Sequence, residues 1–249
     1  MSGLFYNLGK KVGPKVRKAK WMWLSATGSE AETIAVEYEV GQDLAHEIRN
    51  QLGRNQDMQN NQMLGEIGRR LADCVANKHR RFAFETIQGA EPNAFALPGG
   101  FVFVTQSLID LCRHNEDEIA FILGHEMAHI IRGHAMNRIV SNSAIRIASR
   151  AASVRGLFSG WLRRVGVKFL ESAYSQDMES EADRLGVRLV ITAGYDPQGG
   201  VELFTRLAQL HSSGGRTNLG NYFSSHPSFE VRIHRIHRLS NKPRRQARS

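Results

Sequence analysis

Two histidines and a glutamate in the segment Gly124-His125-Glu126-Met127-Ala128-His129 have the residue types and the spacing for metal chemistry. In an α-helix, His125 and His129 share one face, because residues i and i+4 are neighbours there. Two imidazoles placed one turn apart can both bind a metal at roughly 2.0–2.1 Å. The carboxylate of Glu126 lies beside that face, where it can meet a metal-bound water. The segment therefore predicts a helix that carries two metal ligands and a general base.

A third ligand is expected in the segment Glu179-Ser180-Glu181-Ala182-Asp183, since a catalytic zinc keeps three protein ligands and one open position. Glu179 and Asp183 are four residues apart, so both side chains leave one helix in the same direction. Glu179 could then bind the metal, while Asp183 accepts a hydrogen bond from a ligand imidazole and fixes its orientation. Glu181 points elsewhere and is expected in solvent. Taken alone, the segment could also be an acidic helix start paired with Arg184.

His226 is the candidate for one further catalytic group, because it lies on a turn before Pro227 and the helix that follows. From there it could donate to the oxyanion that develops in the transition state. A plain helix cap is an equally good interpretation of its spacing. His114 and His134 are close to the motif in sequence but out of phase with its metal-binding face, so neither is expected to be a ligand.

The elements that must position these residues are expected to be mainly helical. Asn115, with Glu118 three residues later, is a capping-box-like start for the motif helix. That helix carries enough apolar residues to be a core helix, and a core helix could simply bury two hydrogen-bonded imidazoles. Periodicity and breakers predict the other helices over residues 30–52, 64–75, 106–113, 171–193, 196–211 and 226–239.

Between the helices, residues 81–105 change to a period of two. Three short extended pieces, ending at Thr86, Leu97 and Thr105, are separated by Gly/Pro turns and predict a small antiparallel meander. The third piece, Phe101–Thr105, is apolar throughout and is expected to be covered on both faces. The predicted fold class is therefore α+β, mainly helical, with this meander beside the motif helix.

Charge is concentrated at the two ends of the 249-residue chain, whose net charge is +9. Residues 1–29 carry six Lys/Arg and no acid, and residues 232–249 carry seven and no acid. The ends predict contact with an anionic surface, although solvated tails are an equally good interpretation. We expect a basic arm over 1–29, a catalytic domain over 30–240 and a disordered tail over 241–249.

No window of the chain is long and apolar enough for a transmembrane helix. Lys and Arg recur from Lys10 to Lys20, so the N-terminus also lacks a secretory signal, while a transit or membrane-surface segment stays open. We therefore expect a cytoplasmic protein or one peripheral to an anionic membrane, with organellar targeting as a further possibility. The glycine pairs at 99–100 and 199–200 lack a nucleotide-binding pattern. Neither a nucleotide nor a nucleic acid is expected as a partner.

Four segments, in this order, resemble the gluzincin metallopeptidases that include the CAAX prenyl proteases and the HtpX-like, OMA-type and BepA-type quality-control proteases. They span roughly residues 60–240, and as an ordered set they are highly specific. The segments are Asn93-Ala94-Phe95-Ala96-Leu97-Pro98-Gly99-Gly100, the HExxH motif followed by Gly133-His134, Glu179-Ser180-Glu181-Ala182-Asp183, and Ser225-His226-Pro227 with Arg232.

The resemblance implies a role for each residue of the predicted metal site. His125, His129 and Glu179 are similar to the family's zinc ligands, and Glu126 to its catalytic base. Asp183 matches the acid behind a ligand imidazole. His226, in the segment above, matches a histidine near the metal that assists the transition state or occupies the open position.

The resemblance also implies how substrate is bound. The stretch Asn93–Leu97, and Asn93, Ala94 and Phe95 in particular, looks like the family's edge strand, on which a peptide is bound as an added strand. Unpaired backbone groups on an edge recognise extended chains with little demand on their side chains. Many relatives have apolar segments after the HExxH helix. This chain instead has residues 135–170, in which arginines alternate with apolar residues. They could form a basic hairpin that lies on a membrane surface or covers the site, or a solvated pair of helices.

The sequence thus predicts a zinc-dependent endopeptidase, with one catalytic zinc ion, that cleaves unfolded or damaged polypeptides. The alternative is a non-catalytic protein that binds a membrane or nucleic acid and keeps a structural zinc. It draws on the basic ends and on residues 135–170.

Overall fold

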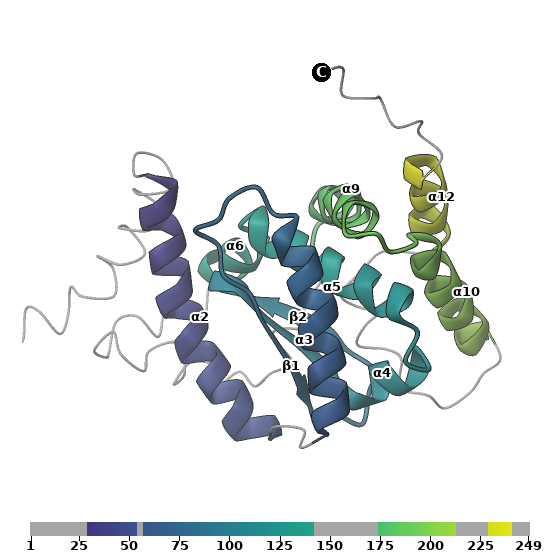
Figure 1. The fold of residues 1–249 in the computed structure, drawn as a ribbon, viewed down its shortest axis with the longest axis horizontal. Coiled ribbons are helices and arrows are strands. Elements are labelled where there is room, and N and C mark those ends of the chain that lie inside the picture. Colours follow the sequence, from purple (N-terminus) through teal and green to yellow (C-terminus); the bar gives the residue numbers. More distant parts are fainter. Residues whose placement is uncertain (1–28, 54–56, 142–173, 213–228, 241–249) are drawn as a thin grey trace, which may run out of the picture.

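The computed structural model describes residues 29–53, 57–141, 174–212 and 229–240 (Figure 1). This part of the chain is mainly helical and contains one small sheet, which confirms the predicted α+β class. The strands are β1 (Ala83–Ile87), β2 (Ala94–Leu97) and β3 (Phe101–Thr105), with a 3-10 turn at Pro98–Gly100. The helices are α2 (Glu30–Leu52), α3 (Met58–Asp73), α4 (Gln106–Leu111), α5 (Glu116–Ile131), α6 (His134–Ser141), α9 (Gln176–Thr192), α10 (Gln198–Ser212) and α12 (Phe229–Ser240).

The sheet has the order β1-β3-β2, with β1 parallel and β2 antiparallel to β3. The predicted antiparallel meander is therefore wrong, because β1 and β2 do not pair and β3 lies between them. The reason lies in the composition of β3, whose five residues Phe-Val-Phe-Val-Thr are all buried. A strand that is apolar on both faces is stabilised best at the centre of a sheet, with a layer on each side.

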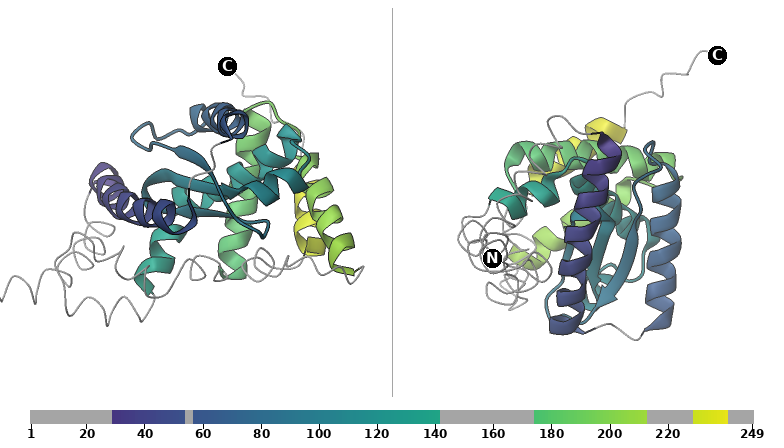
Figure 2. Two further views of the ribbon diagram at one scale, coloured as in Figure 1. Left: turned by 90° about the horizontal axis from the view of Figure 1, so that it is seen from below. Right: turned by 90° about the vertical axis from the view of Figure 1, so that its left-hand side faces the viewer.

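The two faces of the sheet pack against different helices. Val102 and Val104 of β3 join a cluster with α3, α5 and α9, whereas Phe101 and Phe103 join a cluster with α2. This alternation follows from the two-residue period of a strand. The sheet consequently separates α2 on one side from the larger helical layer on the other, with α10 and α12 farthest from α2 (Figures 1 and 2).

Helices α5 and α9 approach each other closely at a pair of glycines. A Cβ atom added to Gly124 would lie 3.1 Å from the carbonyl oxygen of Gly186, and one added to Gly186 would lie 3.0 Å from the backbone nitrogen of His125. Contacts this short are tighter than almost all real Cβ contacts, so a side chain at either position would require the neighbouring backbone to shift by a few tenths of an ångström. The backbones themselves are therefore in contact one residue away from the first motif histidine.

None of the described helices has the length and apolar character needed to cross a bilayer. The predicted arm and tail lie outside the described residues, apart from Ser29, which caps α2 and accepts a hydrogen bond from the backbone of Glu32. Most of residues 135–170 also lies outside them.

Candidate metal centre

The HExxH motif lies on α5, whose start is fixed by a side-chain cap. Asn115 accepts hydrogen bonds from the backbone N–H groups of Asp117 (2.9 Å) and Glu118 (3.1 Å), as expected for an N-cap. Glu118 does not close a capping box and instead accepts two hydrogen bonds from Arg206 of α10, at 2.6 and 2.7 Å. This pair, of a buried Glu118 and a half-buried Arg206, connects the start of the motif helix to α10.

Three candidate ligands meet between α5 and α9. Nε2 of His125 lies 3.1 Å from Nε2 of His129 and 3.4 Å from Oε2 of Glu179, while Nε2 of His129 lies 3.3 Å from Oε1 of Glu179. His125 is 1% exposed, and the other two have no exposed surface. Within the described residues, this is the group of histidine and carboxylate side chains arranged to hold a metal ion.

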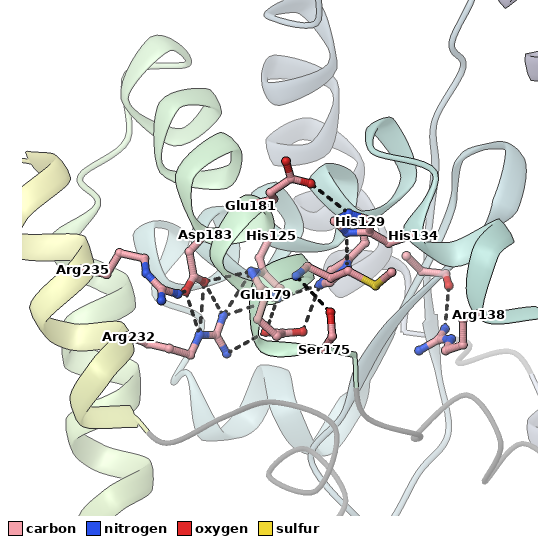
Figure 3. A network of polar contacts seen from close by, with 12 residues as sticks. His125, His129, His134, Arg138, Ser175, Glu179, Glu181, Asp183, Arg232 and Arg235 are labelled. Carbon is pink, nitrogen blue, oxygen red and sulfur yellow. Dashed lines mark hydrogen bonds and ion pairs between the residues drawn. The ribbon is translucent and has the colours of Figure 1, made fainter. Parts of the chain in front are cut away.

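Beside His125 lies a buried carboxylate with two arginines. Nδ1 of His125 is 3.2 Å from Oδ1 of Asp183, which also accepts a hydrogen bond of 2.7 Å from Arg232, while Oδ2 accepts one of 2.8 Å from Arg235 (Figure 3). Burial by itself would raise the pKa of Asp183, but the charge of Arg232 and the hydrogen bonds hold it well below its usual range. Asp183 is therefore an anion that can accept the Nδ1–H of His125, and Nη2 of Arg232 lies 3.1 Å from the same nitrogen.

Beside His129 lies a chain of partners with less charge. Nδ1 of His129 is 3.1 Å from Nδ1 of His134, and Nε2 of His134 is 3.2 Å from Oε2 of Glu181. Burial lowers the pKa of His134, although Glu181 opposes that effect. A neutral His134 can donate from Nε2 to Glu181 and accept at Nδ1 from His129. The expectation that Glu181 is only solvated is wrong: its side chain is 42% exposed, yet it anchors this chain.

Both hydrogen-bond chains select the same tautomer of the two motif histidines. With Nδ1–H donated outward, His125 and His129 each direct the lone pair of Nε2 toward the other and toward Glu179. Two such lone pairs 3.1 Å apart repel each other unless a proton or a cation lies between them. Ligands of a tetrahedral zinc at 2.0–2.1 Å are roughly 3.3–3.4 Å apart, close to the separations found here. The donor set therefore fits a zinc ion.

The electrostatics of the site also favour a bound cation. Burial and the charge of Arg232 would lower the pKa of His125, but Glu179 and Asp183 outweigh them and raise it to about 9. A buried imidazole that holds a proton so strongly lies in a strongly negative potential. A divalent cation would satisfy that potential in place of the proton.

Glu126, the candidate base, is 2% exposed and lies on α5 beside the cluster. Burial raises its pKa to about 7, an effect that the charge of His125 opposes and that of Glu179 reinforces. In the part of the chain that the structure describes, its Oε1 atom is buried with no hydrogen-bond partner. Such an atom has a lone pair available for a water or a substrate proton.

Tyr174 covers the cluster from the side of His129. Its ring stacks on the His129 ring with a centroid distance of 3.9 Å and an interplanar angle of 17°. The guanidinium of Arg138, on α6, lies 4.4 Å from the centroid of the same ring and donates a hydrogen bond of 3.2 Å to the backbone oxygen of Ala96. A continuous set of contacts thus runs from the metal centre to strand β2.

The residues predicted to bind substrate lie on or beside β2. Ala94 and Phe95 belong to this strand and Asn93 directly precedes it, at the edge of the described sheet. Their side chains are buried, with exposed fractions of 3%, 5% and 7%. Any contact with a peptide would therefore use their backbone groups. The predicted catalytic residue His226 lies outside the described residues.

Three residues around the metal centre were not predicted to act there from their spacing. Arg232, on the last helix, is fully buried against Asp183. His134 and Tyr174 contact His129, although neither is on the metal-binding face of α5. The sequence did indicate a role for Arg232, because this residue belongs to one of the segments that carry the family resemblance. His234 and His237, on the same helix, are exposed.

An HExxH helix that is paired with a glutamate from a second helix, beside a small sheet, defines a metallopeptidase of the zincin type. The family model described as peptidase family M48 matches residues 58–240, and the chain belongs to this family. The match confirms the resemblance inferred from the four sequence segments. It also confirms the predicted enzyme class, that of the metallopeptidases.

Curated relatives carry related names. The chain is 31% identical over 160 residues to the mitochondrial metalloendopeptidase OMA1 of Schizosaccharomyces pombe, covering 63% of this chain and 46% of the relative. It is 32% identical over 158 residues to the metalloprotease LoiP of Escherichia coli, covering 61% and 60%. Over 174 residues it is 30% identical to a putative beta-barrel assembly-enhancing protease of Vibrio cholerae, covering 63% and 35%. The chain thus spans between about a third and three fifths of the length of these relatives.

Proposed function

We propose that this protein is a zinc-dependent metalloendopeptidase that hydrolyses peptide bonds of unfolded or damaged polypeptides. The observation that carries the proposal is the buried cluster of His125, His129 and Glu179, with Glu126 beside it. Structural zinc sites are usually closed by four protein ligands, whereas catalytic sites keep three and leave one position open. The three donors found within the described residues favour the catalytic interpretation over a structural zinc. The names of the relatives, metalloendopeptidase and metalloprotease, support it.

In the proposed reaction, His125, His129 and Glu179 would hold a zinc ion, which when bound would supply Lewis-acid activation of a water molecule. Glu126 accepts the proton of that water as it attacks the peptide carbonyl, and then delivers the proton to the leaving amine. Burial raises the pKa of this carboxyl group, which makes it a better proton acceptor than an exposed glutamate. Asp183 holds the Nδ1–H of His125, so that Nε2 stays directed at the metal. We assign the second oxyanion donor to His226 on sequence grounds.

Substrate recognition is proposed to use the backbone of β2. An extended peptide would pair with this strand as an additional strand, an interaction that needs backbone hydrogen bonds and little side-chain complementarity. The buried side chains of Asn93, Ala94 and Phe95 fit this mode, because they are not accessible for sequence-specific contacts with a substrate. Unfolded segments meet the requirement for an extended chain, which supports a role in protein quality control.

The mechanism is tested by Glu126→Gln, which keeps the size of the side chain and removes its basicity. We expect the variant to bind one zinc ion per chain, and its cleavage of casein to fall by 10²–10⁴-fold, the usual contribution of a general base. Glu179→Ala is expected to lose metal as well as activity, measured by metal analysis after dialysis. A Glu126→Gln protein that contains zinc and cleaves casein at the normal rate would contradict the role of Glu126 as the general base.

We further propose that the protein acts at the surface of an anionic membrane. The basic residues of 1–29 and those after Arg235 support this placement, since each basic residue near such a surface contributes about 1 kcal/mol of attraction. Arg232 and Arg235 do not take part, because both are paired with Asp183. Relatives are named as mitochondrial, and a basic, acid-free N-terminus also suits organellar targeting. Flotation with anionic liposomes should recover the full chain and less of a chain that lacks residues 1–29. Equal recovery of both would remove the arm from the proposal.

A further inference from the structure

Strand β2 presents two residues whose backbone groups face away from its partner strand. The backbone N–H of Thr105 donates to the carbonyl of Asn93 at 2.9 Å, so Asn93 and Thr105 form a hydrogen-bonded pair. In an antiparallel ladder such pairs alternate with pairs that do not hydrogen-bond. In the observed register, Ala94 opposite Val104 and Ala96 opposite Val102 are of the second kind. The N–H and C=O groups of Ala94 and Ala96 therefore point to the open edge.

One of these edge groups is already bonded within the protein. Arg138 donates from Nη2 to the carbonyl oxygen of Ala96 at 3.2 Å, across 42 residues of sequence. The donor takes the position that the N–H of an added strand would take. Ala96 has no exposed surface and Ala94 is 3% exposed. A peptide that pairs with this edge must consequently displace what covers it, and Arg138 is bonded to the acceptor that the peptide needs.

The guanidinium is held there by a second contact. It lies 4.4 Å from the centroid of the Tyr174 ring, within the range of a cation–π interaction. Tyr174 is 7% exposed and stacks on the candidate ligand His129. Its hydroxyl has no hydrogen-bond partner within the described residues, so the contacts that hold it are those of its ring. Arg138 thus joins the peptide-binding edge to the ring that covers the metal centre.

We propose that Arg138 is a competitor for the substrate at the β2 edge, and that an extended peptide binds only when its own N–H replaces the guanidinium on the Ala96 carbonyl. The inference rests on the proposed peptidase function and on strand addition as the binding mode. Arg138 is not a catalytic residue in this scheme. It lowers the affinity of every extended peptide alike, because it acts on a backbone group, and it leaves the chemical step unchanged.

The proposal predicts tighter peptide binding once the competitor is removed. Arg138→Met keeps an unbranched, flexible side chain with the apolar stem, but it has no donor for the Ala96 carbonyl and no charge for the Tyr174 ring. Loss of the hydrogen bond and of the cation–π contact should make peptide binding about 3- to 10-fold tighter. Measured as cleavage of casein, the same change should lower KM by that factor with kcat within about twofold.

The direct measurement is fluorescence anisotropy with a labelled casein peptide and zinc-loaded protein that carries Glu126→Gln, so that binding is observed without cleavage. Arg138→Met is added to this background. Arg138→Lys, which keeps one cationic donor but not the planar guanidinium, should give a smaller gain. Arg188→Met is the matched control, because Arg188 is exposed on α9 and its loss changes the net charge equally. We expect the control to bind as the parent does.

Unchanged or weaker binding by both Arg138 variants, at normal zinc content and thermal stability, would overturn the proposal. If Arg138→Met does not fold, the Arg138→Lys comparison decides it alone. The proposed function has a separate readout: binding of casein by the Glu126→Gln protein without any cleavage by the parent would count against the peptidase activity, and the Arg138 comparison would still stand on binding.

Discussion

The two candidate imidazole ligands have opposite surroundings. Behind His125 lies Asp183, a fully buried carboxylate that two arginines hold from α12. Behind His129 lies His134, a residue only five positions further along the chain, followed by the partly exposed Glu181. The first environment is charged, buried and built from distant segments. The second is nearly neutral and largely local.

Because their surroundings differ, His125 and His129 depend on different parts of the fold for their orientation. The orientation of His125 requires that α12 is docked, because Arg232 and Asp183 are buried together and neither charge is tolerated alone. The orientation of His129 uses the turn between α5 and α6, the contact of His134 with Glu181 of α9, and the stacked Tyr174 ring. His129 is also the candidate ligand in contact with Tyr174, and through Arg138 with strand β2. One half of the site is therefore fixed by buried charge, and the other half is connected to the strand that we propose binds substrate.

The largest loss of stability and of zinc affinity is expected at Arg232. Arg232→Met removes a buried cation from Asp183 while Arg235 remains, so we expect a loss of about 3 kcal/mol in the free energy of unfolding. Zinc affinity should fall about 10- to 100-fold as His125 loses its fixed orientation. Urea denaturation and competition with a chelator measure the two effects. Arg238→Met, an exposed position on the same helix, is the control. A stable, zinc-replete Arg232→Met protein would contradict the dependence on α12.

A smaller effect is expected at His134. His134→Phe keeps an aromatic ring but removes the acceptor for Nδ1–H of His129, so zinc affinity should fall about tenfold. The unsatisfied N–H should lower the free energy of unfolding by about 1–2 kcal/mol, less than the loss at Arg232. The same two measurements apply, with His237→Phe as an exposed control. A loss of stability equal to that of Arg232→Met would show that the two sides are not different in kind.

The smallest effect is expected at Glu181. Glu181→Gln keeps an acceptor for Nε2–H of His134 and removes only a charge, and the side chain is 42% exposed. Water screens such a charge, so zinc affinity should change less than about threefold. Isothermal titration at low and high salt is the test. A large, salt-independent loss would mean that the charge itself orients His129.

Much of the described fold could be predicted from the sequence, because local patterns dictate it. The expected helix over residues 30–52 matches α2, and the stripe Leu64, Ile67, Leu71 and Val75 is buried. Strand positions were also predicted, but not their pairing. Pairing depends on which strand has two covered faces, and the apolar character of Phe101–Thr105 indicated the centre of the sheet more directly than its place in the chain did.

The metal donors could likewise be predicted as a group, since i,i+4 spacing places His125 and His129 together on any helix. Their surroundings could not. Arg232 is an arginine on a helix with other arginines, and nothing in its spacing distinguishes the buried one. His134 contacts His129 because the chain turns at Gly133, whose φ of 71° is available to glycine at little cost. Both contacts depend on tertiary packing or on a single turn, which periodicity does not report.

The contact between Gly124 and Gly186 bears on the choice of ion. Because the two backbones touch there, the gap between the imidazoles on one helix and the carboxylate on the other is set by main-chain atoms. That gap suits bonds of about 2.0–2.1 Å, whereas calcium requires 2.3–2.6 Å. A methyl group at either glycine would push the helices apart and widen the cage toward larger cations. The size of the ion that fits would then be set at the residue next to His125, by the absence of side chains on both helices.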